Sequence, residues 1–165
     1  MNLNLFSLIM ICTGLLSVGL IAYVWRYRHV KGVKAFILCL FSLSIWSFFY
    51  GLELASPTIG QMLFWIKFEY LGIVSISPLW LVLVVLYTGR EHWITRKNIF
   101  LLFILPFINL LMVYTTQWHH LFYKRVYLDV QHGIPLLGIE HGPWFWVHTI
   151  SVSYTHLTLP TIYSV

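Results

Sequence analysis

Three charged residues, Glu53, Lys67 and Glu69, interrupt long apolar stretches of the sequence. A charge inside a membrane segment is costly and by default marks a functional site. Glu53 ends one apolar run and Lys67 stands early in the next, so we expect both side chains to reach the interface and form an ion pair there. Glu69 lies about 10 Å further along its helix than Met62, at about 1.5 Å per residue. Glu69 is therefore the best candidate for a ligand or signalling contact, with a buried structural hydrogen bond to Ser75, Tyr50 or a helix missing from this sequence as the equal alternative.

A second group with possible chemistry is the histidine pair His119-His120. Adjacent side chains point apart on a helix and to opposite faces of a strand, so the two rings cannot share one metal ion easily. The nearest further ligand types form no recognised zinc spacing; these are Asp129, His132, Glu140 and His141. We expect no metal site and no cofactor, and a surface or packing role for the pair. His148 is expected to be a helix-packing histidine.

Other catalytic and binding patterns are absent from the sequence. There is no nucleophile elbow, zinc-protease, phosphate-loop, dinucleotide or kinase catalytic-loop motif, and five acidic residues leave little acid–base chemistry. We therefore expect no catalytic residues. Nucleic-acid binding is also excluded, because the basic residues stand at the boundaries of apolar runs and form no basic groove.

The composition identifies the environment that must position these residues. The 165 residues are 59% hydrophobic, 18% aromatic and 9% charged, whereas about 25% of an average soluble domain is charged. The mean hydropathy is +0.81. These values predict an all-α, polytopic helical membrane protein whose first partner is the lipid bilayer.

Five apolar runs indicate where the helices lie. Each is bounded by turn-forming or basic residues, and we expect helices over residues 3–24, 33–55, 62–87, 99–116 and from 143 onward. Pro78 and Pro106 fall inside two of these runs, and a kink is expected at Pro78. Residues 117–142 form the one extended segment that is not predicted to lie in the membrane.

The basic residues predict the orientation of these helices. Seven of the ten Lys and Arg residues lie in or beside the first and third loops; these are Arg26, Arg28, Lys31, Lys34, Arg90, Arg96 and Lys97. By the positive-inside rule these loops are cytoplasmic. The N-terminus and the loop 117–142 are then extracytoplasmic.

The last fifteen residues have an unusual pattern. Residues 152–161 resemble the in-frame translation of a sequencing-library adaptor. We therefore expect residues 151–165 to be non-native, and residues 1–150 to hold four complete helices and the start of a fifth.

Three short motifs resemble a known family. The first comprises residues 69–72 (Glu-Tyr-Leu-Gly), followed by Pro78 and residues 87–89 (Tyr-Thr-Gly). The others are residues 119–123 (His-His-Leu-Phe-Tyr) and 142–146 (Gly-Pro-Trp-Phe-Trp). In this order and on these helices they resemble the N-terminal seven-transmembrane sensor region of bacterial histidine kinases and diguanylate cyclases. The resemblance covers residues 1 to about 150.

The resemblance implies part of a seven-helix bundle in the bacterial plasma membrane. Such a module passes an extracytoplasmic or intramembrane signal to cytoplasmic output domains, most often those of a two-component histidine kinase. The implied partners are a second copy of the parent protein and a response regulator. The candidate signal contacts are Glu69, Tyr70, His119, His120, Trp144 and Trp146.

Two other functions are compatible with the sequence. A transporter or channel fragment would carry paired helices broken by Gly or Pro, of which Pro78 and Pro106 give a faint hint. An integral membrane metalloenzyme would use His119, His120 and Glu69.

Overall fold

The computed structural model describes residues 3–131 and 134–162. The main elements in chain order are α1 (Leu5–Val24), α2 (Val33–Leu54), α3 (Ile59–Tyr87), α4 (Arg96–Tyr114), α5 (Thr116–His119), β1 (Tyr123–Gln131), β2 (Ile134–His141) and α6 (Pro143–Ile162). Short 3₁₀ turns, η1 (Trp25–Tyr27) and η2 (Glu91–Trp93), lie in the first and third loops. Four helical stretches are long and apolar enough to cross a membrane. The prediction of a polytopic helical membrane protein is thus confirmed.

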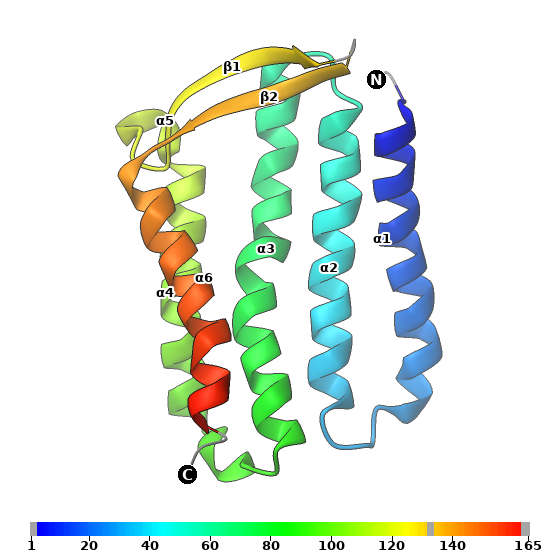
Figure 1. Cartoon of the computed structure of the whole chain (residues 1–165). Coiled ribbons are helices and arrows are strands. Elements are labelled where there is room, and N and C mark those ends of the chain that lie inside the picture. The colour runs from blue at the N-terminus through cyan, green and yellow to red at the C-terminus, as the bar shows by residue number, and fades with distance from the viewer. Residues whose placement is uncertain (1–2, 132–133, 163–165) are drawn as a thin grey trace.

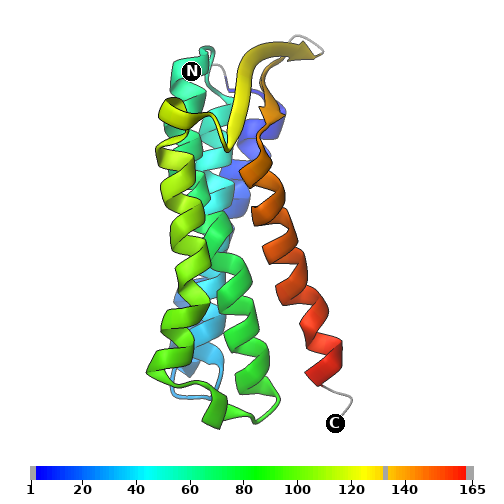
Figure 2. The ribbon, with the colours of Figure 1, turned by 90° about the vertical axis from the view of Figure 1, so that its left-hand side faces the viewer.

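The long helices stand side by side, and their connections alternate between the two ends of the bundle (Figure 1). The turn between α2 and α3, the start of α1 and the β-hairpin share one end, which we call the hairpin end. The basic first and third loops share the other end, where Lys31 Nζ lies 2.7 Å from Glu91 Oε1. The view turned by 90° shows α6 leaning away from the other helices toward its C-terminal end (Figure 2).

Small residues bring α1, α2 and α3 close together. A Cβ atom built on Gly51 of α2 would lie 2.6 Å from Ile11 Cγ1 of α1, and one on Gly72 of α3 would clash with the Ser42 carbonyl oxygen of α2. The Ser44 hydroxyl also donates to the Gly14 carbonyl at 2.9 Å. Small residues let helices approach closely in lipid, where no hydrophobic force drives them together. These three helices therefore pack backbone against backbone.

Side-chain hydrogen bonds cap the N-termini of α1 and α4. The helices α3 and α4 begin earlier than the apolar pattern predicts. Asn4 and Ser7 form a reciprocal capping box at the start of α1, and Asn4 Nδ2 also donates to the Leu54 carbonyl at 2.9 Å. The Thr95 side chain accepts from Asn98 N, so α4 begins at Arg96 instead of residue 99. A capping threonine determines where a helix begins, but its position does not appear in a hydropathy pattern. The helix α3 begins at Ile59, three residues before its apolar run.

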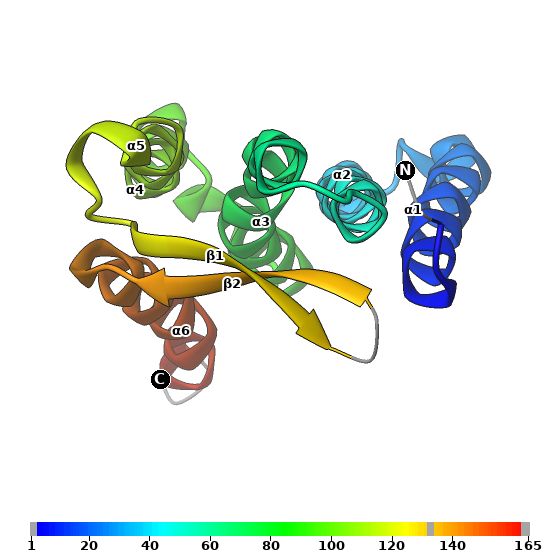
Figure 3. The same ribbon diagram turned by 90° about the horizontal axis from the view of Figure 1, so that it is seen from above.

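The segment 117–142 contains an antiparallel hairpin, whereas the sequence predicted only a loop outside the membrane. Strands β1 and β2 pair in register from Tyr123 with His141 to Gln131 with Ile134, with an irregularity between Tyr123 and Arg125. Seen from above, the hairpin crosses the ends of the helices from α6 toward α1 (Figure 3). Strand β1 contacts α3, and β2 contacts α2. The hairpin thus covers one end of the bundle.

The helix α6 runs without interruption through residue 151 to Ile162. Residues 151–162 are thus helical. Their origin as adaptor sequence stays a prediction.

Candidate functional site

The fully buried ring of Phe122 lies at the centre of the hairpin end of the bundle. Its exposed fraction is 0%. The ring packs edge-on against Tyr70 of α3 at 5.3 Å between centroids and against Phe145 of α6 at 6.0 Å. Edge-to-face pairs of this kind are favourable in addition to the area that they bury. One aromatic side chain thus joins the start of the hairpin to two helices.

Backbone hydrogen bonds hold the two ends of the hairpin segment together. Gly142 N donates to the Phe122 carbonyl at 2.8 Å, and Trp144 N donates to the Leu121 carbonyl at 3.0 Å. A Cβ atom on Gly142 would collide with the Leu121 carbonyl oxygen, so this close approach requires glycine. The first turn of α6 is therefore fixed to the residues that precede β1.

A chain of side-chain hydrogen bonds links α4 to α6. Trp144 Nε1 donates to Asn109 Oδ1 at 3.0 Å, and Asn109 Nδ2 lies 3.0 Å from His148 Nδ1. Asn109 is 2% exposed and His148 is 7% exposed. Because the amide nitrogen can only donate, His148 Nδ1 is the acceptor and its Nε2 carries the ring proton. These bonds form a polar link between two buried helix faces.

Two buried carboxyl groups meet between α2 and α3. Glu53 is 7% exposed and Glu69 is 5% exposed, and their side chains hydrogen-bond to each other. The Glu69 oxygen Oε1 has no hydrogen-bond donor beside it. The expected structural partner Ser75 instead donates to the Leu71 carbonyl at 2.7 Å.

The expected ion pair between Glu53 and Lys67 is not the arrangement found. Lys67 Nζ lies over the Tyr114 ring of α4, 5.9 Å from its centroid. Among residues 3–131 and 134–162, neither glutamate has a basic nitrogen within the 4.0 Å of a salt bridge. Residues two apart point to nearly opposite faces of a helix, so α3 directs Lys67 toward α4 and Glu69 toward α2, which explains the difference.

Tyr123, at the start of β1, packs against Tyr70 and lies within electrostatic reach of this carboxyl pair. It is 3% exposed, and its hydroxyl lies near that of Tyr70 without a well-formed hydrogen bond. Burial raises the pKa of this hydroxyl, and the neighbouring Tyr70, Glu69 and Glu53 raise it further. The hydroxyl therefore remains a hydrogen-bond donor at physiological pH.

The histidine pair lies apart from this cluster and has local partners. His119 Nδ1 accepts from Leu121 N at 3.0 Å, and its Nε2 lies 2.9 Å from Thr115 Oγ1. Both ring nitrogens are thus used in closing the turn. His120 has a positive φ of 52°. The arrangement fits a structural role in the turn between α5 and β1.

A metal site would need several ligand side chains to converge. In the described part of the chain, no three His, Cys, Asp or Glu side chains come together in this way. His132, considered above as a possible ligand, lies outside the described residues.

Of the predicted signal contacts, the structure brings Glu69, Tyr70 and Trp144 to the hairpin end of the bundle, around Phe122 and the α4–α6 link. His119 and His120 lie at its edge, and Trp146 is 60% exposed on α6. Phe122, Asn109 and Tyr123 were not among the predicted contacts. A buried asparagine in a membrane helix is itself a signal that could have identified Asn109.

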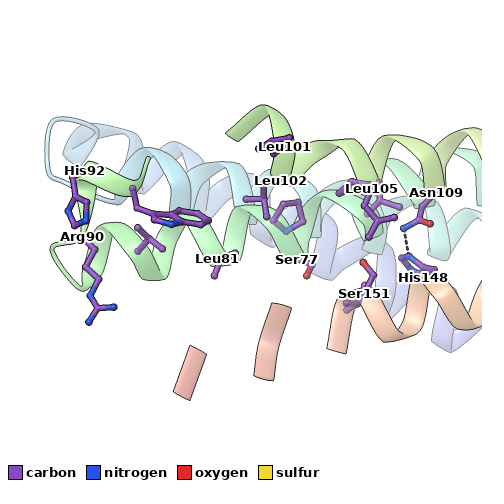
Figure 4. Close-up of a pocket in the computed structure, with 16 residues that line it drawn as sticks. Ser77, Leu81, Arg90, His92, Leu101, Leu102, Leu105, Asn109, His148 and Ser151 are labelled. Atoms are coloured by element: carbon purple, nitrogen blue, oxygen red, sulfur yellow. Dashed lines mark hydrogen bonds between the residues drawn. The ribbon is translucent and has the colours of Figure 1, made fainter. Parts of the chain in front are cut away.

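Below this network, α3, α4 and α6 enclose a cavity of about 680 Å³ (Figure 4). Its walls are mainly apolar, with Asn109 and His148 toward one end and Arg90 and His92 at the other. Ser151 and Val152 complete the α6 wall. Both belong to the segment predicted to be non-native, so we assign the candidate site to the hairpin end, where every contributing residue precedes residue 151.

Comparison with protein families gives a match along most of this chain. The model of the N-terminal 7TM region of histidine kinase matches residues 9–163. No curated protein and no solved structure matches the sequence. The match covers nearly the whole chain, including the four spanning helices, the hairpin and α6. The chain therefore belongs to the family of N-terminal seven-transmembrane regions of histidine kinases.

Proposed function

We propose that this chain is the signal-input module of a histidine kinase and that the hairpin end receives the signal. The observation that carries the proposal is the burial of Phe122 between Tyr70 of α3 and Phe145 of α6. A stimulus that shifts the hairpin must repack this ring, and α3 and α6 would respond together. A signal acts in this way only if it favours one helix arrangement over another.

The output lies on the other side of the membrane in this proposal. The basic loops lie at the end opposite the hairpin, which supports a cytoplasmic location for those loops and an extracytoplasmic N-terminus. The intact parent would act as a homodimer in the bacterial plasma membrane. Its cytoplasmic domains would autophosphorylate and pass the phosphoryl group to a response regulator.

Autophosphorylation of the intact parent kinase in membrane vesicles tests the proposal. Phe122→Leu keeps an apolar side chain but removes the edge-to-face contacts, and we expect it to change the basal rate at least about 5-fold, which corresponds to about 1 kcal/mol. Val130→Ala is the control because Val130 is 61% exposed on the same hairpin. Equal rates for the Phe122→Leu variant and the native protein at equal expression would refute the proposal.

Single-cysteine labelling tests the orientation. Cys12 and Cys39, the two native cysteines, are first replaced by serine. His29→Cys, in the first loop, and Lys124→Cys, on β1, then offer exposed thiols at opposite ends. We expect a membrane-impermeant maleimide to label only the cysteine at 124 in intact cells. Labelling at position 29 and not at position 124 would show that the orientation is opposite to the one proposed.

A further inference from the structure

We propose that the carboxyl groups of Glu53 and Glu69 form a binding site for a single proton beneath the hairpin.

The contact between the two carboxyl groups is the first argument. An ionised carboxyl group can only accept hydrogen bonds, so two of them bond to each other only when one carries a proton. Glu53 and Glu69 make this bond while both are more than nine-tenths buried. A shared proton removes one of two negative charges from a place with little access to water.

The unpartnered atoms beside the pair are the second, independent argument. Glu69 Oε1 is buried without a hydrogen-bond partner, and the buried Tyr123 hydroxyl, beside that of Tyr70, makes no well-formed hydrogen bond. Buried polar atoms of this kind need an explanation. When the shared proton leaves, the pair carries two negative charges, and its electrostatic attraction for the Tyr123 O–H dipole grows. When the proton returns, that attraction weakens, so the charge of the pair acts directly on the start of β1.

No other group in the described structure neutralises the pair. The titratable side chains around it, from α2, α3, β1 and α6, are Tyr50, Tyr70, Tyr123 and His148. His148 is engaged with Asn109, and Lys67 is directed to Tyr114. From the start of α1, Asn4 contributes only an amide, bonded to Leu54. A divalent cation is disfavoured because calcium takes about six to eight oxygen ligands and magnesium about six, and only two carboxyl groups meet here.

Infrared difference spectroscopy of the chain in lipid nanodiscs tests the site. We expect a protonated-carboxyl C=O band at acidic pH that disappears as the pH is raised, with one proton released per chain. In the Glu53→Gln and Glu69→Gln variants the band should no longer appear at its native position. The double variant should show no carboxyl band from this site. Glu91→Gln, which removes an exposed carboxylate, is the control and should leave the band unchanged.

Three results would overturn the inference. The first is the absence of a titrating carboxyl band in the native chain, which does not depend on whether any variant folds. The second is survival of the native band in the double variant. The third is loss of the band at constant pH when calcium or manganese is added, which would identify a metal site instead.

If the proton site serves as a signal input, external acidity becomes a signal for the kinase. This role of the site rests on the proposed function, whereas the proton site itself does not. The infrared measurement needs no kinase output, so the two failures are distinguishable. If the band titrates but autophosphorylation of the parent does not follow external pH, the proton site stands and its role as a signal input is refuted. If the band is missing, the role of Phe122 is unaffected.

Discussion

The two halves of this bundle are held together by different kinds of contact. Helices α1, α2 and α3 meet through small residues, so that a single added methyl group would clash. Helices α4 and α6 meet α3 around a cavity of about 680 Å³ and are joined by a few side-chain hydrogen bonds and the Phe122 ring. Close-packed interfaces have few alternative arrangements, whereas a polar link beside a cavity can be remade. The comparison makes α1–α3 the fixed frame and the α4–hairpin–α6 unit the part that responds.

The largest effect is expected from removing the ring that joins the responding unit to the frame. Phe122→Ala should lower the free energy of unfolding by about 3–5 kcal/mol, because it empties a fully buried aromatic site. Denaturant unfolding in detergent micelles measures this loss. Val130→Ala, on the exposed part of the same hairpin, should stay within about 0.5 kcal/mol of the native value. Equal losses for both variants would mean that Phe122 is not the joint.

A methyl group added inside the frame should have the next largest effect. Gly72→Ala places a Cβ against the Ser42 carbonyl and should destabilise the chain by about 1–3 kcal/mol. Gly60→Ala on the same helix is the matched control, since nothing lies within 4 Å of its Cβ position. Alanine should be neutral or stabilising there, because it favours helix by about 1 kcal/mol over glycine. A tolerated Gly72→Ala would contradict the rigid frame.

A double-mutant cycle should measure a smaller energy for the α4–α6 link. Asn109→Ala and His148→Ala, alone and combined, should give a coupling of about 0.6–1.7 kcal/mol. Pairing Asn109→Ala with Gly60→Ala should give additive effects, because those residues share no partner. Zero coupling between Asn109 and His148 would show that the hydrogen bond does not hold the two helices together.

The smallest effect is expected at the opposite end of the molecule. Lys31 and Glu91 form an exposed ion pair with side chains 80% and 45% exposed. Its hydrogen bond with Glu91 raises the pKa of Lys31, so the pair is intact at neutral pH and is lost at alkaline pH. Lys31→Ala should leave the unfolding midpoint unchanged at physiological salt. A clear drop in the unfolding midpoint would show that this ion pair contributes to the stability of the α1–α3 frame.

The membrane helices were the most predictable part of the fold. Lipid requires long continuous apolar segments, and four helices within the described residues are long and apolar enough to span a membrane. The hairpin was missed, although Val126, Leu128 and Val130 alternate with polar or aromatic residues in the pattern of a strand. That signal is weak in a segment flanked by much stronger apolar runs.

The candidate site was predictable only one residue at a time. Glu69 stood out because a charge in an apolar run is costly, but its neighbour Glu53 was expected to pair with Lys67. Which side chains meet depends on the rotation of each helix about its own axis, and the faces of α2 and α3 are set by Gly51 and Gly72. The contact of Tyr70 with Phe122 depends in turn on where the hairpin returns to the bundle.

Hydrogen–deuterium exchange of the chain in nanodiscs tests the division into frame and responding unit most directly. We compare the native chain with the Phe122→Ala variant, peptide by peptide. The account predicts faster exchange in β1, β2 and the first turns of α6, with α1 and α2 unchanged. An equal increase in α1 and α2, or no increase in the hairpin and α6, would contradict it.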